Sequence, residues 1–417
     1  MKHIHKGRLH NFVWLLLALF LGSLVTSCAD DEGGGEEKEK GLPKVYINTP
    51  DAAPITSKVD WVKNGTIRII DSWGKEALFA TSDFRGRGNT TWYNMPKKPY
   101  AVKLSSRAKV LGMPAHKRWV LLANWMDRTL MRNAVAFEIS RCCMSYTPRG
   151  KFVELYMNDV HVGNYYLCEH IKIDKNRVNI DEIEEDTPLQ DVTGGYILEF
   201  DKFAYSEPVH FYTSINNYVV AIKEPDEDVI IDEQHPAYTY IKEYVDNLEV
   251  AFESGDYAAV CNLIDIESFI DSWLVFNLTG NQEPSHPKSF YMHKRRNGKL
   301  YAGPVWDFDW GTFVPGVKST ILQEAFYYRY LFRNAEFKSE VKKRWAQLKP
   351  SFEEIPSFIE ETAAHIAESN AINSVMWPIT QAVNGDEELS FEDAVTRMRE
   401  AYIERLNILD NVITNTF

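Results

Sequence analysis

Residues 303–311 read Gly-Pro-Val-Trp-Asp-Phe-Asp-Trp-Gly and follow a short run of strand-like composition. The two carboxylates, Asp307 and Asp309, lie between aromatic residues, where aspartates are rare unless another group compensates their charge. A divalent metal ion bound by one or both is the leading explanation, and a metal-phosphate site is one natural setting for it. A structural pair capped by backbone N–H groups or bonded to an arginine is the alternative.

The chain begins with a basic segment and an apolar run from Phe12 to Val25, followed by small residues and Cys28. This order is typical of an export signal. Residues 1–28 resemble a bacterial lipoprotein signal peptide, in which Cys28 would be acylated and become the mature N-terminus. An uncleaved membrane helix is the weaker interpretation, because the apolar run is shorter than the about 20 residues that span a bilayer.

Residues 29–42 are mostly acidic or glycine, which predicts a disordered tether between a lipid anchor and a folded region. Acidic residues directly after the lipid-bearing cysteine resemble the surface-export signal of Bacteroidetes lipoproteins. The expected protein is therefore an exported lipoprotein of the outer membrane that faces the cell surface.

The length and composition of the remaining chain limit the fold classes and partners that are compatible with it. About 375 residues from Leu42 onward suit two lobes or one large α+β domain. The formal net charge of −13 argues against nucleic acid as a partner, because phosphate binding needs a basic face. Cysteines besides Cys28 are too few for a disulfide scaffold; they are expected to be mostly buried, although one bridge is compatible with an extracellular location. They are Cys142, Cys143, Cys168 and Cys261.

The first half of the chain predicts a β-rich region over residues 43–228. β-Branched and aromatic runs bounded by turn residues indicate strands. Their ranges are 44–48, 66–70, 100–104, 152–156, 165–167, 196–200 and 218–222, with 158–164 as a hairpin connection. One helix interrupts them, with Asp127 or Thr129 as its cap and an apolar face from Leu130 to Ile139.

From about Asp232 the hydrophobic period changes from two to about 3.6, which predicts a mainly helical region over residues 229–417. Helical spacing covers residues 234–254, 266–278, 335–348, 351–369 and 389–413. Residues 290–301 predict a hairpin with Asn297-Gly298 at its turn. The helical half therefore contains the Asp307-Phe308-Asp309 segment, called the Asp element below.

Residues 83–92 combine Arg85 and Arg87 with closely spaced glycines. Guanidinium groups and accessible backbone N–H groups together predict a cradle for an anion. A tight turn with solvated arginines is an equally simple interpretation. In the strand that follows, alternation places Lys103 on the opposite face from Val102 and Leu104, and a lone lysine on a strand is usually solvated.

A polar, proline-containing loop follows the helix predicted at 266–278, about two dozen residues before Asp307. Such a loop could present Glu283 as a base and Asn281 or Ser289 as a contact to metal or phosphate. His286 lies between two prolines and has no second histidine at ligand spacing. We expect it to be a surface residue.

Seven blocks stand in the sequence in the order RGRGNTTW (85–92), KKPY (97–100), WVLLAN (119–124), LMRN (130–133), GGYILE (194–199), KEP (223–225) and GPVWDFD (303–309). Together they resemble the spore-coat protein H (CotH) kinase family. The resemblance implies an α+β fold, an atypical protein-kinase-like arrangement of two lobes. It also implies transfer of the γ-phosphoryl group of ATP to Ser or Thr hydroxyls of a protein, with Mg²⁺ or Mn²⁺. The order of elements predicted above is also that of protein kinases.

The resemblance implies roles for the residues around the Asp element. Asp307 would hold magnesium, with Asp309 as a second ligand or its support, and Asn281 or Ser289 would complete the metal shell. Glu283 would orient or deprotonate the acceptor hydroxyl. The family commonly has Asp at that position, and the extra methylene moves the carboxylate by about an ångström, which lowers activity where positioning dominates.

The nucleotide side of the site is assigned in the same way. Lys103 would contact the phosphates, positioned by Glu138 on the helix, with Arg85 and Arg87 nearby. Lys223 would lie at the hinge beside adenine.

Two other functions stay open on the sequence. The first is a surface module that binds protein or glycan on a kinase fold with weak or lost catalysis. The second, less favoured, is a metal-dependent phosphohydrolase, whose usual pattern has Thr two residues after the second Asp, whereas here Thr312 is three residues after Asp309.

Overall fold

The computed structural model describes residues 41–226, 228–230, 233–316 and 322–417. The predicted signal peptide with Cys28, and most of the predicted tether, lie outside these ranges. Leu42, the last residue assigned to the tether, is 8% exposed and belongs to the largest hydrophobic core. The packed region therefore includes Leu42, because its apolar side chain is buried among neighbours and not solvated.

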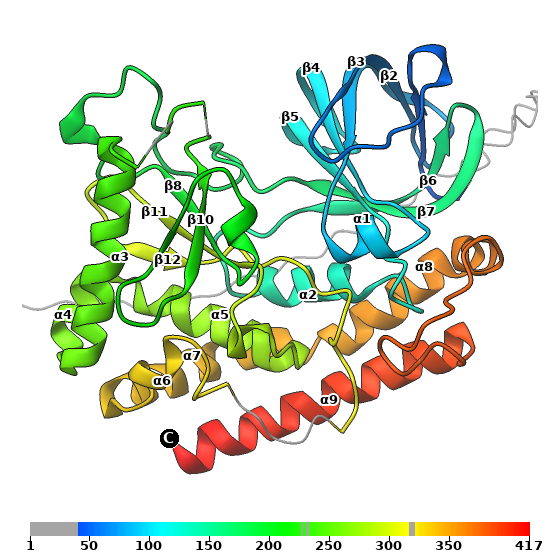
Figure 1. Cartoon of the computed structure of the whole chain (residues 1–417). Helices are drawn as coiled ribbons and strands as arrows, with labels where there is room; N and C mark the ends of the chain where they lie inside the picture. Colours follow the sequence, from blue (N-terminus) through cyan, green and yellow to red (C-terminus); the bar gives the residue numbers. More distant parts are fainter. Residues whose placement is uncertain (1–40, 227, 231–232, 317–321) are drawn as a thin grey trace, which may run out of the picture. The chain divides into compact units, whose positions relative to one another are not determined.

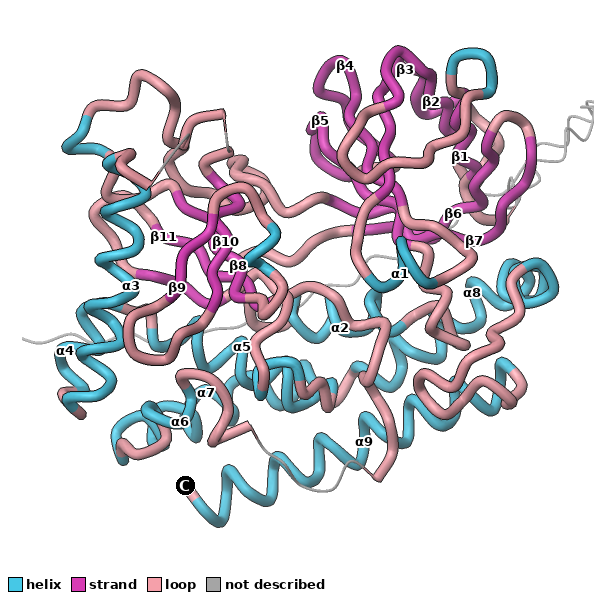
Figure 2. The backbone as a smooth tube through the Cα atoms, viewed as in Figure 1, coloured by secondary structure: helices cyan, strands magenta, loops and turns pink. Residues whose placement is uncertain are grey.

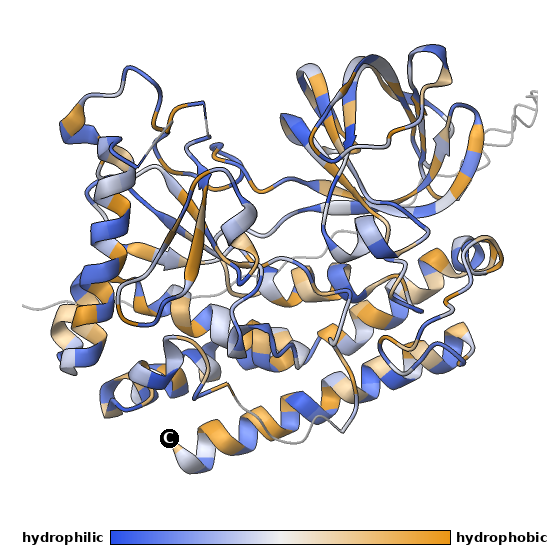
Figure 3. Ribbon diagram, in the orientation of Figure 1, coloured by the Kyte–Doolittle hydropathy of each residue, from blue (hydrophilic) through white to orange (hydrophobic). Residues whose placement is uncertain are grey.

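Seven strands close into a barrel in the order β1-β2-β3-β4-β5-β7-β6 (Figure 1). Neighbours pair antiparallel except β1 and β6, which are parallel. The strands are β1 (Lys44–Asn48), β2 (Val62–Ile70), β3 (Glu76–Gly86), β4 (Tyr100–Val110), β5 (Met113–Leu122), β6 (Gly150–Met157) and β7 (Val160–Glu169). Hydropathy alternates along them (Figure 3), because successive side chains face the interior and the outer surface in turn. Val102 and Leu104 belong to the interior cluster, so the opposite orientation predicted for Lys103 is confirmed.

A second sheet has the strand order β12-β11-β8-β10-β9, with every pair antiparallel (Figure 2). Its strands are β8 (Tyr196–Phe200), β9 (His210–Tyr212), β10 (Val219–Glu224), β11 (Phe290–Lys294) and β12 (Leu300–Ala302). The strands come from both sides of residue 228, so the boundary predicted there does not separate a β-rich half from a helical half. Pairing of β11 with β8, distant in sequence, produces this arrangement.

The helices are α1 (Thr90–Asn94), α2 (Arg132–Arg141), α3 (Pro236–Ser254), α4 (Tyr257–Leu263), α5 (Ile266–Thr279), α6 (Tyr328–Leu331), α7 (Ala335–Phe352), α8 (Ile355–Met376) and α9 (Phe391–Thr416). α2 packs against α5 and α8, and α9 lies beside both α5 and α8 (Figures 1 and 2). Within the described ranges, no helix combines the length and the apolar run that a bilayer crossing requires.

α5 has well-defined ends that fix the start of the polar loop. The Asp265 carboxylate accepts a hydrogen bond from the Ser268 N–H at the first turn. Gly280 ends the helix with φ 70, a left-handed conformation that glycine adopts without steric cost. The loop with Glu283 therefore leaves a buried helix at a set position and direction.

The largest core joins α2, the second sheet and the helices that follow it, whereas the barrel interior forms a separate cluster. Val120 and Cys168, on the outer face of the barrel, belong to the larger core. The barrel thus packs against the remaining elements through β5 and β7. The four described cysteines are free, and only Cys168 is fully buried, so the expectation that most are buried is only partly met.

Three details differ from the sequence expectations. The strand signal does not identify β3 and β5, because charged residues occupy their outward positions. Arg85 lies within β3, not in a loop. α2 begins at Arg132, while the Asp127 carboxylate accepts the N–H groups of Thr129 and Arg132 ahead of the helix.

Candidate functional site

The polar loop after α5 and the Asp element meet at a cluster of charged side chains. Nζ of Lys288 lies 2.8 Å from Oε1 of Glu283 and 3.7 Å from Oδ2 of Asp307. The side chain of Glu283 is 15% exposed and that of Asp307 is 37% exposed, so the cluster opens to solvent at Asp307. One ammonium group therefore lies between the candidate base and the candidate metal ligand.

Ser289 and Asp201 complete this cluster. The Ser289 N–H donates to Oδ2 of Asp201 at 3.1 Å, and the Ser289 hydroxyl donates to Oδ2 of Asp307 at 3.4 Å. Ser289 has φ 48 and Asp307 has φ 69, both in the left-handed region. This conformation costs free energy in residues other than glycine and is concentrated at functional sites.

The surroundings of Glu283 change its acid strength. Burial, followed by the nearby Asp307 carboxylate, raises the pKa of Glu283 to about 8, although the Lys288 ammonium acts in the opposite direction. Oε2 of Glu283 is buried and has no hydrogen-bond partner among the described residues. A carboxyl group with a pKa near neutrality and one unpaired oxygen is suited to exchange a proton with a bound hydroxyl.

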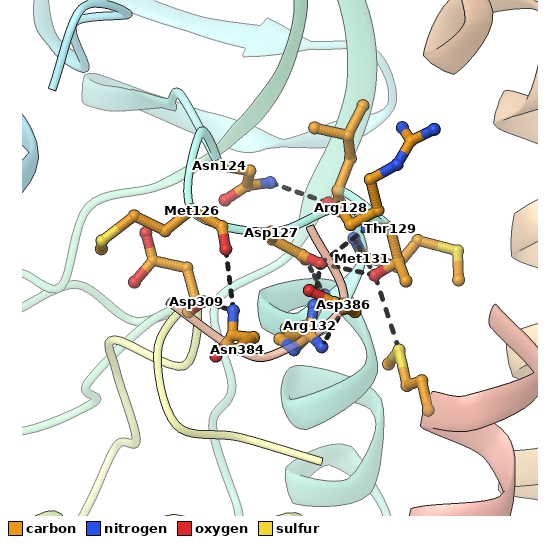
Figure 4. A network of polar contacts seen from close by, with 12 residues as sticks. Asn124, Met126, Asp127, Arg128, Thr129, Met131, Arg132, Asp309, Asn384 and Asp386 are labelled. Carbon is orange, nitrogen blue, oxygen red and sulfur yellow. Dashed lines mark hydrogen bonds and ion pairs between the residues drawn. The ribbon is translucent and has the colours of Figure 1, made fainter. Parts of the chain in front are cut away.

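Asp309 lies deeper than Asp307. It is 8% exposed, and burial together with the Asp307 charge raises its pKa to about 7. Its backbone carbonyl accepts from Nδ2 of Asn384, which also donates to the Met126 carbonyl (Figure 4). Oδ1 of Asn384 accepts the Gly311 N–H at 2.8 Å. These bonds fix the backbone at the C-terminal end of the Asp element.

The first residues of α2 hold the other part of the Asp element. The buried guanidinium of Arg132 contacts Asp127 and, at 2.5 Å, Asp386 (Figure 4). Oδ1 of the next residue, Asn133, accepts the Phe308 N–H at 2.8 Å. Arg132 thus compensates two other carboxylates, and among the described residues Lys288 is the cation that pairs with Asp307.

Asn281 shapes the loop that presents Glu283. It is 1% exposed, its Oδ1 accepts the Glu283 N–H at 2.8 Å, and its Nδ2 donates to Oγ1 of Thr312 at 3.3 Å. Both ends of the amide are therefore engaged. Of the two residues predicted to complete a metal shell, Ser289 is the one whose side chain contacts Asp307.

The barrel contributes a cation next to the Asp element. Cζ of Arg87, just after β3, lies 5.1 Å from the ring centre of Trp306, which directly precedes Asp307. Arg85 lies elsewhere, with Cζ 4.6 Å from the Trp61 ring and a guanidinium N–H that donates to the Val59 carbonyl. The two arginines of the predicted cradle thus have different surroundings.

Lys103 lies in a row of charged residues across the outer face of the barrel. The sheet register pairs Lys103 with Asp83 on β3 and with Arg118 on β5. Cζ of Arg118 lies 5.2 Å from the ring of Trp61. This face therefore has two cations beside an aromatic ring. Such a surface suits the binding of a nucleotide better than a lone solvated lysine does.

Two predicted nucleotide contacts have other partners. Oε2 of Glu138 accepts from Nε of Arg141 at 2.9 Å, one turn along α2, and among the contacts of the described residues no ion pair joins Glu138 to Lys103. Nζ of Lys223 lies 2.7 Å from Glu207 and 3.5 Å from Glu199. Because β10 is an inner strand of the second sheet, residue 223 is not the connection that leaves the barrel; residues 170–195, between β7 and β8, form that connection.

The oxygen donors at the cluster suit a hard divalent cation, since Mg²⁺ prefers carboxylate and hydroxyl oxygens. In the part of the chain that the structure describes, no three histidine, cysteine, aspartate or glutamate side chains converge as a metal site. The protein would therefore supply only part of the coordination shell through Asp307, Asp309 and Ser289. Phosphate oxygens and water commonly supply the rest for Mg²⁺.

Residues 84–409 match the family described as CotH kinase protein. The chain belongs to the CotH kinase family. The match begins near the end of β3 and ends within α9, so it includes Arg87, Lys103, Glu283 and the Asp element. No protein of curated function matches the chain.

The sequence patterns do not identify Asp201 and Lys288 in the charged cluster, or Arg118 beside Lys103 on the barrel of this CotH kinase family member. Lys288 carries a usable signal, because it lies in the same polar loop as Glu283. Asp201 and Arg118 are single charges at a strand end and on an outward strand face. Sheet pairing brings Asp201 to the cluster and Arg118 beside Lys103, and a single sequence does not specify that pairing.

Proposed function

We propose that this CotH kinase family member is an ATP-dependent protein kinase that transfers the γ-phosphoryl group to Ser or Thr hydroxyls, with Mg²⁺ or Mn²⁺. The observation that carries the proposal is the cluster of Glu283, Lys288 and Asp307. The cluster brings together Glu283, whose carboxyl group has a pKa of about 8, and the more exposed carboxylate of Asp307. Glu283 lies in the loop after α5, and Asp307 lies in the Asp element, after the hairpin of β11 and β12. Protein kinases place their catalytic loop and magnesium aspartate in the same order.

Each residue of the cluster has a role in this proposal. Glu283 orients the acceptor hydroxyl and accepts its proton. Lys288 presents a positive charge beside the transferred phosphoryl group. Asp307, with Asp309 and Ser289, holds the divalent cation, which when bound neutralises charge on the phosphate oxygens.

The barrel side contacts the nucleotide. Arg87 donates to phosphate oxygens from its position beside Trp306, and Lys103 with Arg118 extends the positive face. The barrel with α2 then corresponds to the N-terminal lobe of a kinase, and the second sheet with the later helices to the C-terminal lobe. Support for this two-lobe comparison is the separate barrel core and the position of α2 against the Asp element.

The test is nucleotide binding and transfer by the full-length chain. ATP with Mg²⁺ should raise the melting temperature, and label from γ-labelled ATP should appear on a protein acceptor. Asp307→Asn should lower transfer by at least about 100-fold, because the metal-bound phosphate loses its main anchor. Asp186→Asn, at an exposed aspartate, is the matched control.

Other outcomes would redirect the assignment. No stabilisation by ATP at any metal concentration, and no label transfer, would reject the kinase function and favour a surface module that binds protein or glycan. Release of phosphate from simple phosphoesters without any need for nucleotide would favour a phosphohydrolase.

A further inference from the structure

A large cavity lies apart from the cluster of Glu283, Lys288 and Asp307, called the kinase cluster below. Its volume is about 980 Å³, which is at the upper end for ligand pockets. Its walls are the segment between α2 and β6, the segment after β7, the first turns of α5 and the β11–β12 hairpin. Neither Glu283, Lys288 nor Asp307 lines it.

The cavity has a charge balance opposite to that of the chain. Five Lys or Arg residues line it against three acidic residues, whereas the whole chain carries a net charge of −13. Two of the acids are already engaged: Asp265 caps α5, and Asp271 accepts two hydrogen bonds from Arg344 at 2.8 Å each. Two of the basic residues are engaged as well, Arg141 by Glu138 and Arg149 by Glu169, whereas Lys175 and Arg295 form no ion pair among the described residues.

Two buried donors at the positive side have no partner. Nη2 of Arg177 and Oη of Tyr146 are buried, and neither forms a hydrogen bond within the described residues. Both residues line the cavity. A buried donor without a partner is destabilising, so two at one wall indicate a missing acceptor.

The neighbours of these donors define the missing group. Arg149 bonds Glu169 at 2.8 Å, and Nε of Arg177 lies 3.8 Å from the same carboxylate. Two guanidinium groups thus share one carboxylate and leave one positive charge. Burial and Glu169 raise the pKa of Tyr146 well above its usual value, so the phenol keeps its proton and remains a donor. A cation and a neutral donor side by side favour an oxyanion.

We propose that this cavity binds a small organic anion through a carboxylate or phosphoryl group held by Arg177 and Tyr146. An inorganic ion is too small to fill the space. Tyr301 and His293, stacked at 5.2 Å between ring centres, also line the cavity, and Cζ of Arg295 lies 4.6 Å from the Tyr301 ring. Lys175, exposed at the same wall, attracts the anion from solvent.

The experiment uses the full-length chain and two probes, citrate for carboxylates and inorganic phosphate for phosphoryl groups. Each is titrated at constant ionic strength, and the rise in melting temperature gives an apparent Kd. Tyr146→Phe removes only the unpaired hydroxyl, so the free protein should melt at or above the wild-type temperature. Its affinity for the better probe should fall about ten-fold or more, the size expected for a hydrogen bond to a charged group.

Two further variants keep the result interpretable. Lys175→Ala should lower affinity and its salt dependence without unfolding the chain, and Tyr212→Phe, an exposed tyrosine outside the cavity, should change nothing. Anion binding at the kinase cluster would instead be lost in Arg87→Ala and kept in Tyr146→Phe. Equal stabilisation of the wild type, Tyr146→Phe and Lys175→Ala would overturn the proposal, as would a crystal structure with citrate that shows only water beside Tyr146 and Arg177.

Discussion

The Lys288 ammonium group lies beside Asp307, the carboxylate that is proposed to bind a metal ion. Its Nζ contacts Glu283 and lies 3.7 Å from Oδ2 of Asp307. A buried carboxylate is stable only when it is paired or protonated, and Lys288 is the only described cation within ion-pair distance of Glu283. The side chain at position 288 therefore decides how much of Glu283 is ionised before any ligand binds.

We predict that Lys288→Met raises the pKa of Glu283 above about 8, because the variant lacks the group that favours the carboxylate. A folded-state pKa above that of the unfolded chain means that Glu283 contributes stability below about pH 4.5, and that this contribution is lost as the pH rises through about 8. In Lys288→Met the loss should extend to higher pH. The measurement is the free energy of unfolding in urea from pH 5 to 9.5 in metal-free buffer.

Glu283→Gln supplies the reference for this prediction, because it removes the titrating group and keeps the shape of the side chain. The difference between wild type and Glu283→Gln isolates the Glu283 contribution, on the order of a few kcal/mol across the range. Lys343→Met, on the exposed face of α7, is the control for a lost lysine. Superimposable difference curves for wild type and Lys288→Met would contradict the assigned contact.

At the scale of elements, the start of α2 positions the Asp element. Arg132 lies between Asp127 and Asp386, and the adjacent Asn133 accepts the Phe308 N–H. The three charged residues come from α2, from the turn before it and from the segment before α9. One buried network thus ties three separate parts of the chain to the backbone of the site.

Arg132→Met should destabilise the protein by about 3–5 kcal/mol, because two buried carboxylates lose the only cation that pairs with them among the described residues, while the volume of the side chain is nearly kept. Urea unfolding measures the loss. Adding Asp127→Asn and Asp386→Asn to Arg132→Met should recover part of it, since the uncompensated charges are then gone. Arg68→Met, which breaks an exposed pair with Glu76, should cost less than about 1 kcal/mol. Equal losses in the two arginine variants would refute the buried network.

Local patterns predict elements well where burial follows the period of the element. β1 has the same bounds as its predicted run, and the 3.6-residue spacing identifies α3, α5, α7, α8 and α9 to within a few residues at most of their ends. β3 and β5 are not predicted, because charged residues on their outward faces, such as Asp83 and Arg118, interrupt the run of β-branched and aromatic residues that indicates a strand. Asp307 is identifiable in the sequence as a carboxylate among aromatic residues and Glu283 as an acid in a polar, proline-containing loop, but their link through Lys288 depends on the fold.

At the scale of the whole molecule, sheet pairing connects segments that the sequence separates. The second sheet takes β8 from before residue 228 and β11 from after it, and the site lies at the end of that pairing, with Asp201 following β8 and Ser289 preceding β11. The period of the hydrophobic residues gives information only about residues that are close together in the sequence. The division into a β-rich and a helical half therefore describes the composition of the two segments. It does not describe which strands belong to one sheet.

The location of the molecule rests on a part of the chain outside the described residues. We propose that it is an exported lipoprotein, anchored through Cys28 and facing the cell surface. Phe12 to Val25 would form a helix of only about 21 Å, short of the about 30 Å hydrocarbon core, which favours cleavage and acylation over a spanning helix. Cys28→Ser should therefore abolish incorporation of a labelled fatty acid and block removal of residues 1–27, because both steps require the cysteine.

Cys261→Ser, at a free cysteine in α4, should leave both the anchoring and the fatty acid label unchanged. Protease added to intact cells should digest the wild-type protein if it faces outward, because the acidic segment after Cys28 would hold the folded region off the bilayer. Protection from protease would place the protein on the inner leaflet while leaving the lipid anchor standing. A wild-type protein that takes up no labelled fatty acid and still resists an alkaline carbonate wash would instead show an uncleaved helix, since an inserted helix resists that wash.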